Sequence, residues 1–480
     1  MTILIAKRGL FTAAFVALAS CSGPTTPTQV TTTTGTRLTI TGATVLAPGL
    51  TTQLVATEFL NGVLITLSDN VIWQSSTPAV ATVSSNGFVT ALSVGTTTIT
   101  ARGSTGNGQV TVAVQPPNTA ISVLTTCAAI TSPGTYTVST DLAATGNGCL
   151  NVFNTAAVQI DCQGHAISDL KVTNVSSAMV SNCTVSHNVY VEFGQSITFT
   201  HCSLMAGLTI DKSHSIAVSD SAVASASTQT VAITYSSSVE LLRDDISNSG
   251  SGREIAGGVV LYQSADNRIE QTTISSVYDG GVADAGADDG IILNDEMGDT
   301  IQSNNVTGFF DIGIEGVGNV ANARIADNIL TNIGVGAIGA IYCTDWTSNR
   351  IQANRTSHVP TLVFVGYQVD STRCGTQPPV AVFTNNQFIG NIFRDAANGT
   401  LHRTGAPGPS MTVAMTGVVS GNVLIDNDFA GYYGPNLTPL SGFSDGGGNI
   451  CATPVPGISN FVCTGGISLS DSSIFLSSHR

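Results

Sequence analysis

The feature that most constrains the fold of this chain is a recurring pair of apolar residues separated by four mostly polar ones. The pairs are Val180/Val185, Phe199/Leu204, Val218/Val223, Leu241/Ile246, Ile269/Ile274, Ile301/Val306, Ile325/Leu330, Phe383/Phe388 and Leu424/Phe429. Their first members lie between 19 residues (Val180 to Phe199) and 41 residues (Phe383 to Leu424) apart. A short minimum interval with variable extra length is typical of stacked coils that carry loop insertions. We expect parallel sheets in a rod on the order of 60 Å long, from about a dozen coils at ~4.8 Å spacing.

The residue three positions after each first apolar residue supports the same architecture. It is Cys183, Cys202 and Ser221 early in the repeat, and later Asn304, Asn328, Asn354, Asn386 and Asn427. Asparagine tolerates the left-handed conformation of a tight turn, and stacked amides hydrogen-bond to one another. We therefore expect an asparagine ladder from coil to coil. Cys183 and Cys202 should stack in the interior as small apolar side chains, with Cys162 continuing their column.

The composition indicates an all-β chain with an unusually low content of charged side chains. Only 10% of the residues are charged, Gly, Ser, Thr and Asn are abundant, and long amphipathic helical patterns are absent. The formal net charge of −15 argues against nucleic acid as a partner, because that partner demands a basic face. The same charge disfavours broad attraction to polyanionic sugars unless calcium bridges them.

The N-terminus determines the expected location of the protein. Residues 1–21 have the basic, apolar and small-residue parts of a secretory signal, in that order. Leu18-Ala19-Ser20-Cys21 resembles the lipobox of bacterial lipoproteins, which implies lipidation of Cys21. We expect export and anchoring to the cell envelope, where disulfides persist. Ser22, the second residue of the mature chain, favours the outer membrane by analogy with Gram-negative sorting. Residues 22–36 form a Thr/Pro-rich tether.

Residues 37–115 are expected to form an Ig-like β-sandwich of about seven short strands. Trp73 is a natural core residue between two sheets, and Asn86-Gly87 is a hairpin signal. The segments 73–83, 86–91 and 95–101 resemble the bacterial Ig-like domains of group 2. This resemblance implies a spacer or adhesive module without catalysis. Residues 116–119 are then a linker.

Residues 120–480 are expected to form a single repetitive domain with a Gly/Pro-rich C-terminal cap. The segments Ile130–Ser139, Asp141–Leu142 and Val158–Ile167 resemble the first coils of pectin-lyase-like proteins. The resemblance implies a right-handed parallel β-helix and says little about a reaction. The fold class is therefore all-β, an Ig-like sandwich followed by a right-handed parallel β-helix.

The chain has ten cysteines, so nine remain if Cys21 is lipidated, and at least one thiol is unpaired within the chain. Proximity along the chain suggests three disulfides, and these are Cys127–Cys149, Cys343–Cys374 and Cys451–Cys463. Cys162, Cys183 and Cys202 would then stay reduced. No Cys-x-x-Cys spacing is present to favour a metal site.

Acidic residues concentrate in one long insertion of the repeat. Residues 279–315 hold nine acidic residues, which are Asp279, Asp284, Asp288, Asp289, Asp295, Glu296, Asp299, Asp311 and Glu315. No Lys or Arg lies between Arg268 and Arg324. Loops on one flank of a solenoid are where function is usually placed. Crowded carboxylates must bind a cation, raise some of their pKa values or stay solvated.

Three interpretations of these acids remain open. In the first, Asp288, Asp289, Asp311 and Glu315 are catalytic, because glycoside hydrolysis needs two carboxyl groups around the bond. Gly286–Ile291 resembles the double-aspartate motif of polygalacturonase-type hydrolases, although that family's Asn-Thr-Asp, Gly-His-Gly and Arg-Ile-Lys motifs are missing. In the second, calcium binds the oxygen ligands of Asp288, Asp289, Asp295 and Asp299. In the third, the acids are solvated loop tips.

A calcium site would be structural, or would bridge an anionic sugar in a polysaccharide lyase. A lyase also needs a base to remove a proton from the sugar, and the candidates are Arg324, Arg350 and Arg355.

Because complete catalytic motifs are missing, we favour a non-catalytic surface protein whose β-helix binds a polysaccharide or other glycan. The alternative is a polysaccharide hydrolase or lyase that uses the acidic insertion. Glycan binding calls for aromatic platforms, for which the candidates are Tyr342, Trp346, Phe364, Tyr367, Tyr432 and Tyr433.

Overall fold

The computed structural model describes 17 stretches of the chain. They are residues 36–42, 44–60, 63–65, 71–103, 106–116, 121–144, 148–187, 189–226, 229–250, 257–278, 286–342, 345–368, 381–395, 411–414, 417–433, 436–438 and 440–453. None of the described residues belongs to a helix long and apolar enough to cross a membrane.

The N-terminal domain consists of three small sheets. One has the order β1 (Thr36–Thr41), β4 (Val55–Leu60), β5 (Val63–Ile65). A second has the order β2 (Val45–Leu46), β10 (Asn107–Val114), β9 (Gly95–Arg102), β6 (Ile72–Ser75). The third has the order β3 (Thr51–Gln53), β8 (Phe88–Ala91), β7 (Ala81–Val83). Trp73 packs against the buried core between them, as expected from its position in the sequence.

The hairpin that joins β7 to β8 explains the Asn86-Gly87 signal. Gly87 has φ +83°, and a Cβ added there would lie 2.5 Å from the carbonyl oxygen of Leu54 and 3.0 Å from the Trp73 ring. Only glycine combines that backbone conformation with such a close approach.

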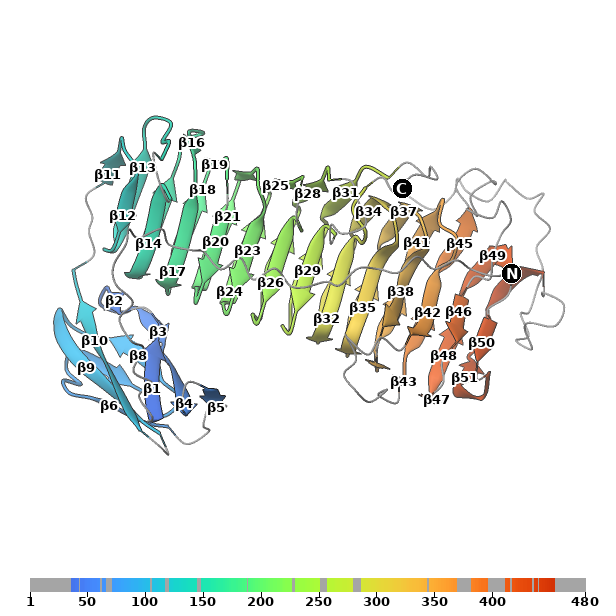
Figure 1. The fold of residues 1–480 in the computed structure, drawn as a ribbon, viewed down its shortest axis with the longest axis horizontal. Coiled ribbons are helices and arrows are strands. Elements are labelled where there is room, and N and C mark those ends of the chain that lie inside the picture. The colour runs from blue at the N-terminus through green and yellow to red at the C-terminus, as the bar shows by residue number, and fades with distance from the viewer. Residues whose placement is uncertain are drawn as a thin grey trace, which may run out of the picture.

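Three long parallel sheets make up the rest of the described chain (Figure 1). Sheet 1 comprises β11 (Ile121–Leu124), β13 (Gly134–Val138), β15 (Val158–Asp161), β18 (Ala178–Ser181), β21 (Gln195–Thr200), β24 (His214–Ser219), β27 (Glu240–Leu242), β30 (Arg268–Glu270), β33 (Thr300–Gln302), β36 (Arg324–Ala326), β40 (Arg350–Gln352), β44 (Gln387–Ile389), β48 (Asn422–Ile425) and β51 (Phe443–Asp445).

Sheet 2 comprises β12 (Ala128–Ile130), β14 (Leu150–Thr155), β17 (Leu170–Val175), β20 (Val189–Glu192), β23 (Leu208–Asp211), β26 (Val231–Thr234), β29 (Val259–Tyr262), β32 (Ile291–Met297), β35 (Ile312–Ala321), β38 (Gly336–Tyr342), β42 (Val363–Gln368), β46 (Met411–Ala414) and β50 (Asn436–Thr438), with β39 (Asp345–Thr347), β43 (Ala381–Thr384) and β47 (Gly417–Ser420) alongside.

Sheet 3 comprises β16 (Ala166–Ile167), β19 (Thr184–Val185), β22 (Ser203–Leu204), β25 (Ala222–Ser225), β28 (Asp245–Asn248), β31 (Thr273–Ser276), β34 (Asn305–Phe309), β37 (Ile329–Ile333), β41 (Arg355–Ser357), β45 (Ile392–Asp395), β49 (Asp428–Tyr433) and β52 (Ile450–Thr453). A short 3₁₀ helix, η1 (Leu440–Gly442), precedes β51.

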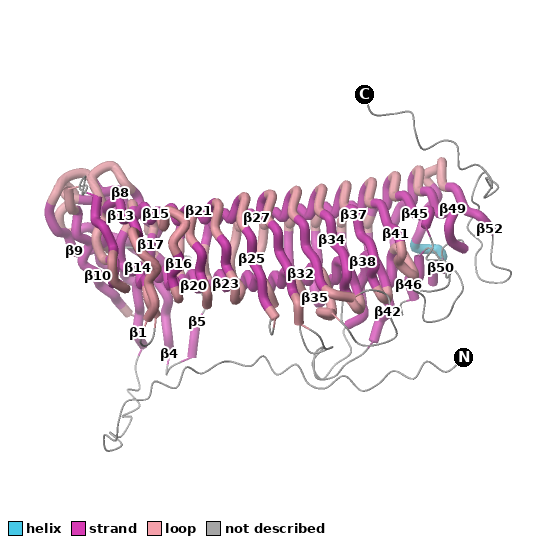
Figure 2. The backbone as a smooth tube through the Cα atoms, turned by 90° about the horizontal axis from the view of Figure 1, so that it is seen from above, coloured by secondary structure: helices cyan, strands magenta, loops and turns pink. Residues whose placement is uncertain are grey.

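The chain visits the three sheets in turn, so each circuit is one coil of a parallel β-helix, and the coils stack into a rod (Figure 2). The apolar pairs of the sequence, except Phe383/Phe388, place their first members in sheet 1 and their second members in sheet 3. Val180 pairs with Phe199, for example, and Val185 with Leu204. These side chains are buried along a single core, because alternate residues of each strand point inward.

The Ig-like domain lies beside the first coils (Figure 1), where the Gln53 N–H donates to Oε1 of Gln195 at 3.0 Å.

A ladder of inward-pointing side chains runs along the corner between sheets 1 and 3. Its members, here called the first ladder, are Cys162, Cys183, Cys202, Ser221, Asp244, Thr272, Asn304, Asn328, Asn354, Asn391, Asn427 and Asn449. The backbone N–H of Asn304 donates to Oδ1 of Asn328 at 3.0 Å, and the Asn304 side-chain amide donates to the same oxygen at 3.0 Å. The predicted asparagine ladder is therefore present.

Two details of that prediction were wrong. The ladder asparagines do not adopt the left-handed conformation themselves, since the residue before each one does, as in Ser303 with φ 58° and Asp327 with φ 57°. Asn386 belongs to a second ladder, at the corner between sheets 2 and 1, where its Oδ1 accepts the Asn349 N–H at 3.1 Å. Phe388, and not Phe383, pairs with Ile351 in sheet 1, so Asn391 is the first-ladder residue of that coil.

Two disulfides lie in the described residues. Cys127 and Cys149 are bonded, as the sequence suggested. Cys162 and Cys183 are also bonded, which corrects the expectation that both stay reduced. Their Cα atoms are 4.8 Å apart, because the two cysteines follow Asp161 and Ser181, which are paired on neighbouring strands. Cys202 is free and buried. The expected pairs Cys343–Cys374 and Cys451–Cys463 have side chains outside the described residues.

Candidate functional site

The four carboxylic acids that were candidates for catalysis come together on two adjacent coils. Asp288 and Asp289 precede β32, Asp311 precedes β35, and Glu315 lies within β35. The Asp311 N–H donates to the Asp288 carbonyl at 2.8 Å, and the Ile312 N–H donates to Oδ1 of Asp289 at 3.0 Å. Glu315 faces outward from sheet 2, because its neighbour Ile314 belongs to the core. We call these four residues the acidic cluster.

The acidic cluster is buried, with exposed fractions of 4% for Asp288 and Asp289, 2% for Asp311 and 5% for Glu315. Burial, followed by the negative charges of Glu315, Asp288 and Asp311, raises the pKa of Asp289 well above its ordinary value. The hydrogen bond from Ile312 opposes this shift without cancelling it. Asp289 therefore holds its proton more tightly than an ordinary aspartic acid, beside carboxyl groups whose charges it senses. An environment that pushes the pKa values of neighbouring carboxyl groups apart is what acid–base chemistry requires.

Aromatic side chains lie near the acidic cluster. Phe310, which precedes Asp311, makes an edge-to-face contact with Tyr278, with ring centroids 5.7 Å apart. Tyr262 points outward from the same face of sheet 2 as Glu315, two strands away, and contacts Tyr235 with centroids 5.5 Å apart. Tyr235 is 51% exposed. Standard sheet dimensions put the Cα atoms of Tyr262 and Glu315 about 12 Å apart.

The proposed calcium ligands do not come together. Asp288 and Asp289 precede β32, whereas Asp295 lies near its far end and Asp299 follows it, and six residues along the strand place Asp295 roughly 20 Å from Asp289. Asp295 is exposed, whereas Asp299 points into the core with an exposed fraction of 0%. In the described part of the chain, no group of three or more His, Cys, Asp or Glu side chains is placed to hold a metal ion.

Glu296 and Asp299 instead form a buried acid pair that the sequence had not singled out as a unit. Oε1 of Glu296 accepts the Ser264 N–H at 2.8 Å, and Oδ1 of Asp299 accepts the Asn267 N–H at 2.9 Å. Burial, followed by the charge of Asp299, raises the pKa of Glu296 far above its ordinary 4.5. Asp299 belongs to the second ladder, so an acid occupies a position that is alanine in the next coil and asparagine in the coils of Asn349, Asn386 and Asn422. A comparison of the residues at this ladder position in successive coils would have identified Asp299 from the sequence.

Replacing Glu296 with glutamine should flatten the dependence of stability on pH. The folded chain keeps a proton on Glu296 that the unfolded chain loses near pH 4.5, so the native state binds more protons and stability falls as pH rises into the alkaline range. One such group contributes a slope of about 1.4 kcal/mol per pH unit. Melting temperatures at pH 5, 7 and 9 should therefore decline less for Glu296→Gln than for the wild type. Glu192→Gln, on the outer face of β20, is the matched control. Parallel declines for wild type and Glu296→Gln would refute this assignment.

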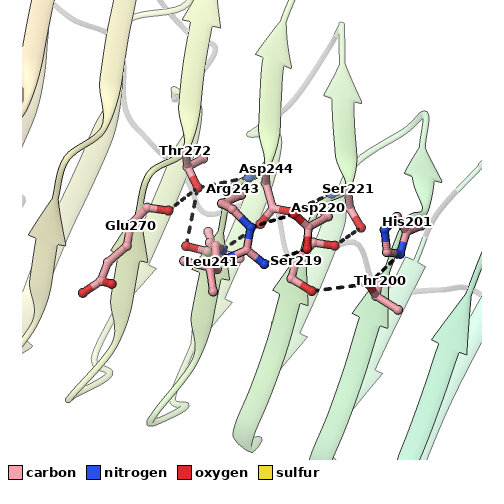
Figure 3. A network of polar contacts seen from close by, with 11 residues as sticks. Thr200, His201, Ser219, Asp220, Ser221, Leu241, Arg243, Asp244, Glu270 and Thr272 are labelled. Carbon is pink, nitrogen blue, oxygen red and sulfur yellow. Dashed lines mark hydrogen bonds and ion pairs between the residues drawn. The ribbon is translucent and has the colours of Figure 1, made fainter.

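A polar network occupies the corner between sheets 1 and 3 (Figure 3). Arg243 makes two hydrogen bonds of 2.7 Å with the Asp220 carboxylate, and Arg243 lowers the pKa of Asp220. Asp244 is a first-ladder residue whose Oδ1 accepts the Ser221 N–H at 2.9 Å, and burial raises its pKa to about 7. Two adjoining hollows of about 450 and 570 Å³ open here and share Asp220 and Ala222 in their walls. This site was not predicted from the sequence, although Asp244 follows Leu241 at the ladder spacing.

The remaining candidates from the sequence lie elsewhere. Trp346 is 1% exposed and stacks on Phe383 in the core, with centroids 6.0 Å apart, so it is not an exposed platform. Arg324 and Arg350 belong to sheet 1 and Arg355 to sheet 3, so none of these lyase bases lies on the sheet that carries Glu315. Side chains outside the described residues are those of Cys21, Asp279, Asp284, Tyr342, Phe364, Tyr367, Tyr432 and Tyr433.

Comparison with known families agrees with this architecture. Residues 32–114 match the bacterial Ig-like domain (group 2), and residues 136–359 match the family described as periplasmic copper-binding protein (NosD). The chain thus carries a group 2 Ig-like domain followed by a right-handed parallel β-helix. No curated protein matches the chain.

Among solved structures, the mannuronan C-5 epimerase AlgE6 A-module of Azotobacter vinelandii is 13% identical, with 70% of this chain and 92% of that chain covered and a TM-score of 0.34. DFA-IIIase of Arthrobacter chlorophenolicus is 12% identical, with 63% and 81% covered and a TM-score of 0.35. Pectate lyase Pel9A is 14% identical, with 52% and 70% covered and a TM-score of 0.27. These likenesses concern the fold alone.

Proposed function

We propose that this protein is an exported polysaccharide-active protein whose reactive site is the acidic cluster. The observation that carries the proposal is the convergence of Asp288, Asp311 and Glu315, from two adjacent coils, with Asp289, whose pKa is raised by burial and by their charges. Hydrolysis of a glycosidic bond needs one carboxylic acid to protonate the leaving oxygen and one carboxylate to act as base or nucleophile. Asp289 is suited to the first role, and Glu315, which raises the pKa of Asp289, to the second.

The charge distribution favours an uncharged polysaccharide as the substrate. The chain carries a net charge of −15, and the acidic cluster adds local negative charge on the outer side of sheet 2. An anionic glycan would be repelled from such a surface. The Tyr235–Tyr262 pair on the same side of the rod offers aromatic surface for contact with sugar rings.

Incubation of the protein with a panel of neutral and anionic polysaccharides tests the proposal. We expect reducing ends to be released from a neutral glycan, without the absorbance at about 235 nm that unsaturated lyase products give. Added calcium and added chelator should leave the rate unchanged. Release from anionic glycans alone, or release that chelator abolishes, would contradict the proposal.

The second candidate is a non-catalytic glycan-binding protein, which is the function the sequence favoured. The low exposure of the acidic cluster, at most 5%, together with the 51% exposure of Tyr235, supports it. Retention of the protein on one polysaccharide without any product release would select this function over hydrolysis. Loss of that retention in Tyr235→Ala would place the binding surface on this side of the rod.

The proposed location is the bacterial envelope, with a lipid on Cys21, the tether of residues 22–36 and the Ig-like domain as a spacer. The group 2 Ig-like match and the periplasmic description of the second family support export. Ser22, as the second residue of the mature chain, favours anchoring in the outer membrane. Cells fed labelled palmitate should label the wild-type protein and not Cys21→Ser, which should leave the membrane fraction. Equal labelling of both proteins would contradict lipidation at Cys21.

A further inference from the structure

The three cysteines of the first ladder lie on three consecutive coils, with Cys183 and Cys202 at the same position and Cys162 one residue earlier relative to the strand register. Asp161, Ser181 and Thr200, which precede them on adjacent strands, are paired in register. The Cα atoms of Cys162 and Cys183 are 4.8 Å apart. The same strand spacing puts Cys202 about 4.8 Å beyond Cys183, within the Cα range of a disulfide, and about 10 Å from Cys162, outside it.

The column holds one disulfide and one thiol, and Cys183 is the neighbour that both other cysteines share. Cys162 is bonded to Cys183, and Cys202 is free and 3% exposed. The hollow of about 450 Å³ at this corner is lined by Cys183 and Cys202, with His201 and Asp220 as its ionisable side chains.

We propose that this disulfide exchanges between two registers along the column. The Cys202 thiolate attacks Sγ of Cys183, so that a Cys183–Cys202 bond forms as the Cys162–Cys183 bond breaks. The bonding electron pair leaves on Sγ of Cys162, which takes up the proton that Cys202 released. One disulfide and one thiol are present before and after, so no oxidant or reductant is consumed.

The geometry of the ladder favours the exchange in two ways. The three residues are stacked along the rod, which places the attacking, central and leaving residues in line, as the mixed-disulfide mechanism requires. The two registers also close loops of nearly equal length, with separations of 21 residues for Cys162–Cys183 and 19 for Cys183–Cys202 (202 minus 183). The loop-closure entropies are therefore nearly the same, and neither register has a large advantage in this respect.

The exchange should be slow at neutral pH and faster in mild alkali. Burial raises the pKa of the Cys202 thiol, whereas the thiolate is the attacking species. His201 and Asp220 are the ionisable groups that line the hollow with it, and Asp220 is held by Arg243 of the next coil (Figure 3). The wild-type protein should therefore be equilibrated at pH 8.5 without denaturant before the thiols are trapped.

Disulfide mapping of the full chain tests the proposal. After equilibration, acid quenching and alkylation, peptide mass analysis of the wild type should find both Cys162–Cys183 and Cys183–Cys202, in amounts within about tenfold of each other. In a glutathione redox buffer, folded Cys162→Ser should form Cys183–Cys202. Folded Cys183→Ser is the matched control and should keep both remaining thiols alkylatable, because Cys162 and Cys202 lie two coils apart. A wild type that shows Cys162–Cys183 alone at every time point overturns the proposal.

Discussion

Replacing Asn328 with alanine should lower the free energy of unfolding by about 4 kcal/mol. The Asn328 side chain accepts hydrogen bonds of 3.0 Å from the backbone and side-chain amides of Asn304. It donates bonds of 2.9 Å to the Ile301 carbonyl and to Oδ1 of Asn354. All of these groups are buried, and each buried polar group that loses its partner costs about 1–3 kcal/mol. Alanine leaves several of them unsatisfied at once.

Thermal and denaturant unfolding, followed by far-UV circular dichroism, measures this effect. Asn319→Ala is the matched control, since Asn319 is an exposed asparagine nine residues earlier, and its replacement should change the stability by less than about 0.5 kcal/mol. Similar stabilities for the two variants would mean that the ladder amides contribute little beyond their volume.

Replacing Asp289 with asparagine should reduce the rate of polysaccharide hydrolysis by about 10²- to 10⁴-fold, the usual contribution of a general acid. Asparagine keeps the Oδ1 that accepts the Ile312 N–H, so the local backbone should hold its position. Asparagine is also uncharged at every pH beside Glu315, Asp288 and Asp311, so the melting temperature should stay level or rise. A loss of activity without a loss of stability separates a chemical role from a structural one.

The pH dependence of the wild-type rate supplies an independent readout. Because burial and neighbouring charges raise the pKa of Asp289, the rate should fall with loss of its proton at a higher pH than the ordinary pKa of an aspartic acid would give. Asp295→Asn, at the exposed end of β32, is the control and should keep the wild-type rate and pH profile. Full activity in Asp289→Asn would exclude Asp289 as the proton donor and favour the non-catalytic candidate.

Much of the fold was predictable because a solenoid repeats the same local requirement once per coil. Val180 and Val185 could be assigned to inward positions on two sheets from their spacing alone, and the structure confirms both. The prediction failed at the coil where Phe383 and Phe388 are both apolar at suitable positions. Pattern alone could not decide which of them continues sheet 1, and only the pairing of Ile351 with Phe388 settles it.

The candidate site was predictable only in part. Asp288, Asp289, Asp311 and Glu315 were chosen because acids cluster there in the sequence, and the structure brings them together through the register of β32 and β35. Asp295 and Asp299 were candidates from the same acid-rich segment of the sequence, yet Asp295 faces solvent and Asp299 faces the core. Sequence proximity does not reveal on which side of the chain an acid points after a left-handed residue such as Asp295 turns the backbone.

The sequence by itself determined the architecture of this protein. Its coil-length apolar period, its asparagine columns and its Ig-like segments each specify local structure that repeats or recurs, so they can be interpreted without knowing distant contacts. The tertiary structure alone decided which residues of neighbouring coils meet. The Cys162–Cys183 bond, the buried pair Glu296–Asp299 and the raised pKa of Asp289 all depend on register between coils and on burial. Loop insertions of variable length change that register from coil to coil, so it is fixed only when the strands pair.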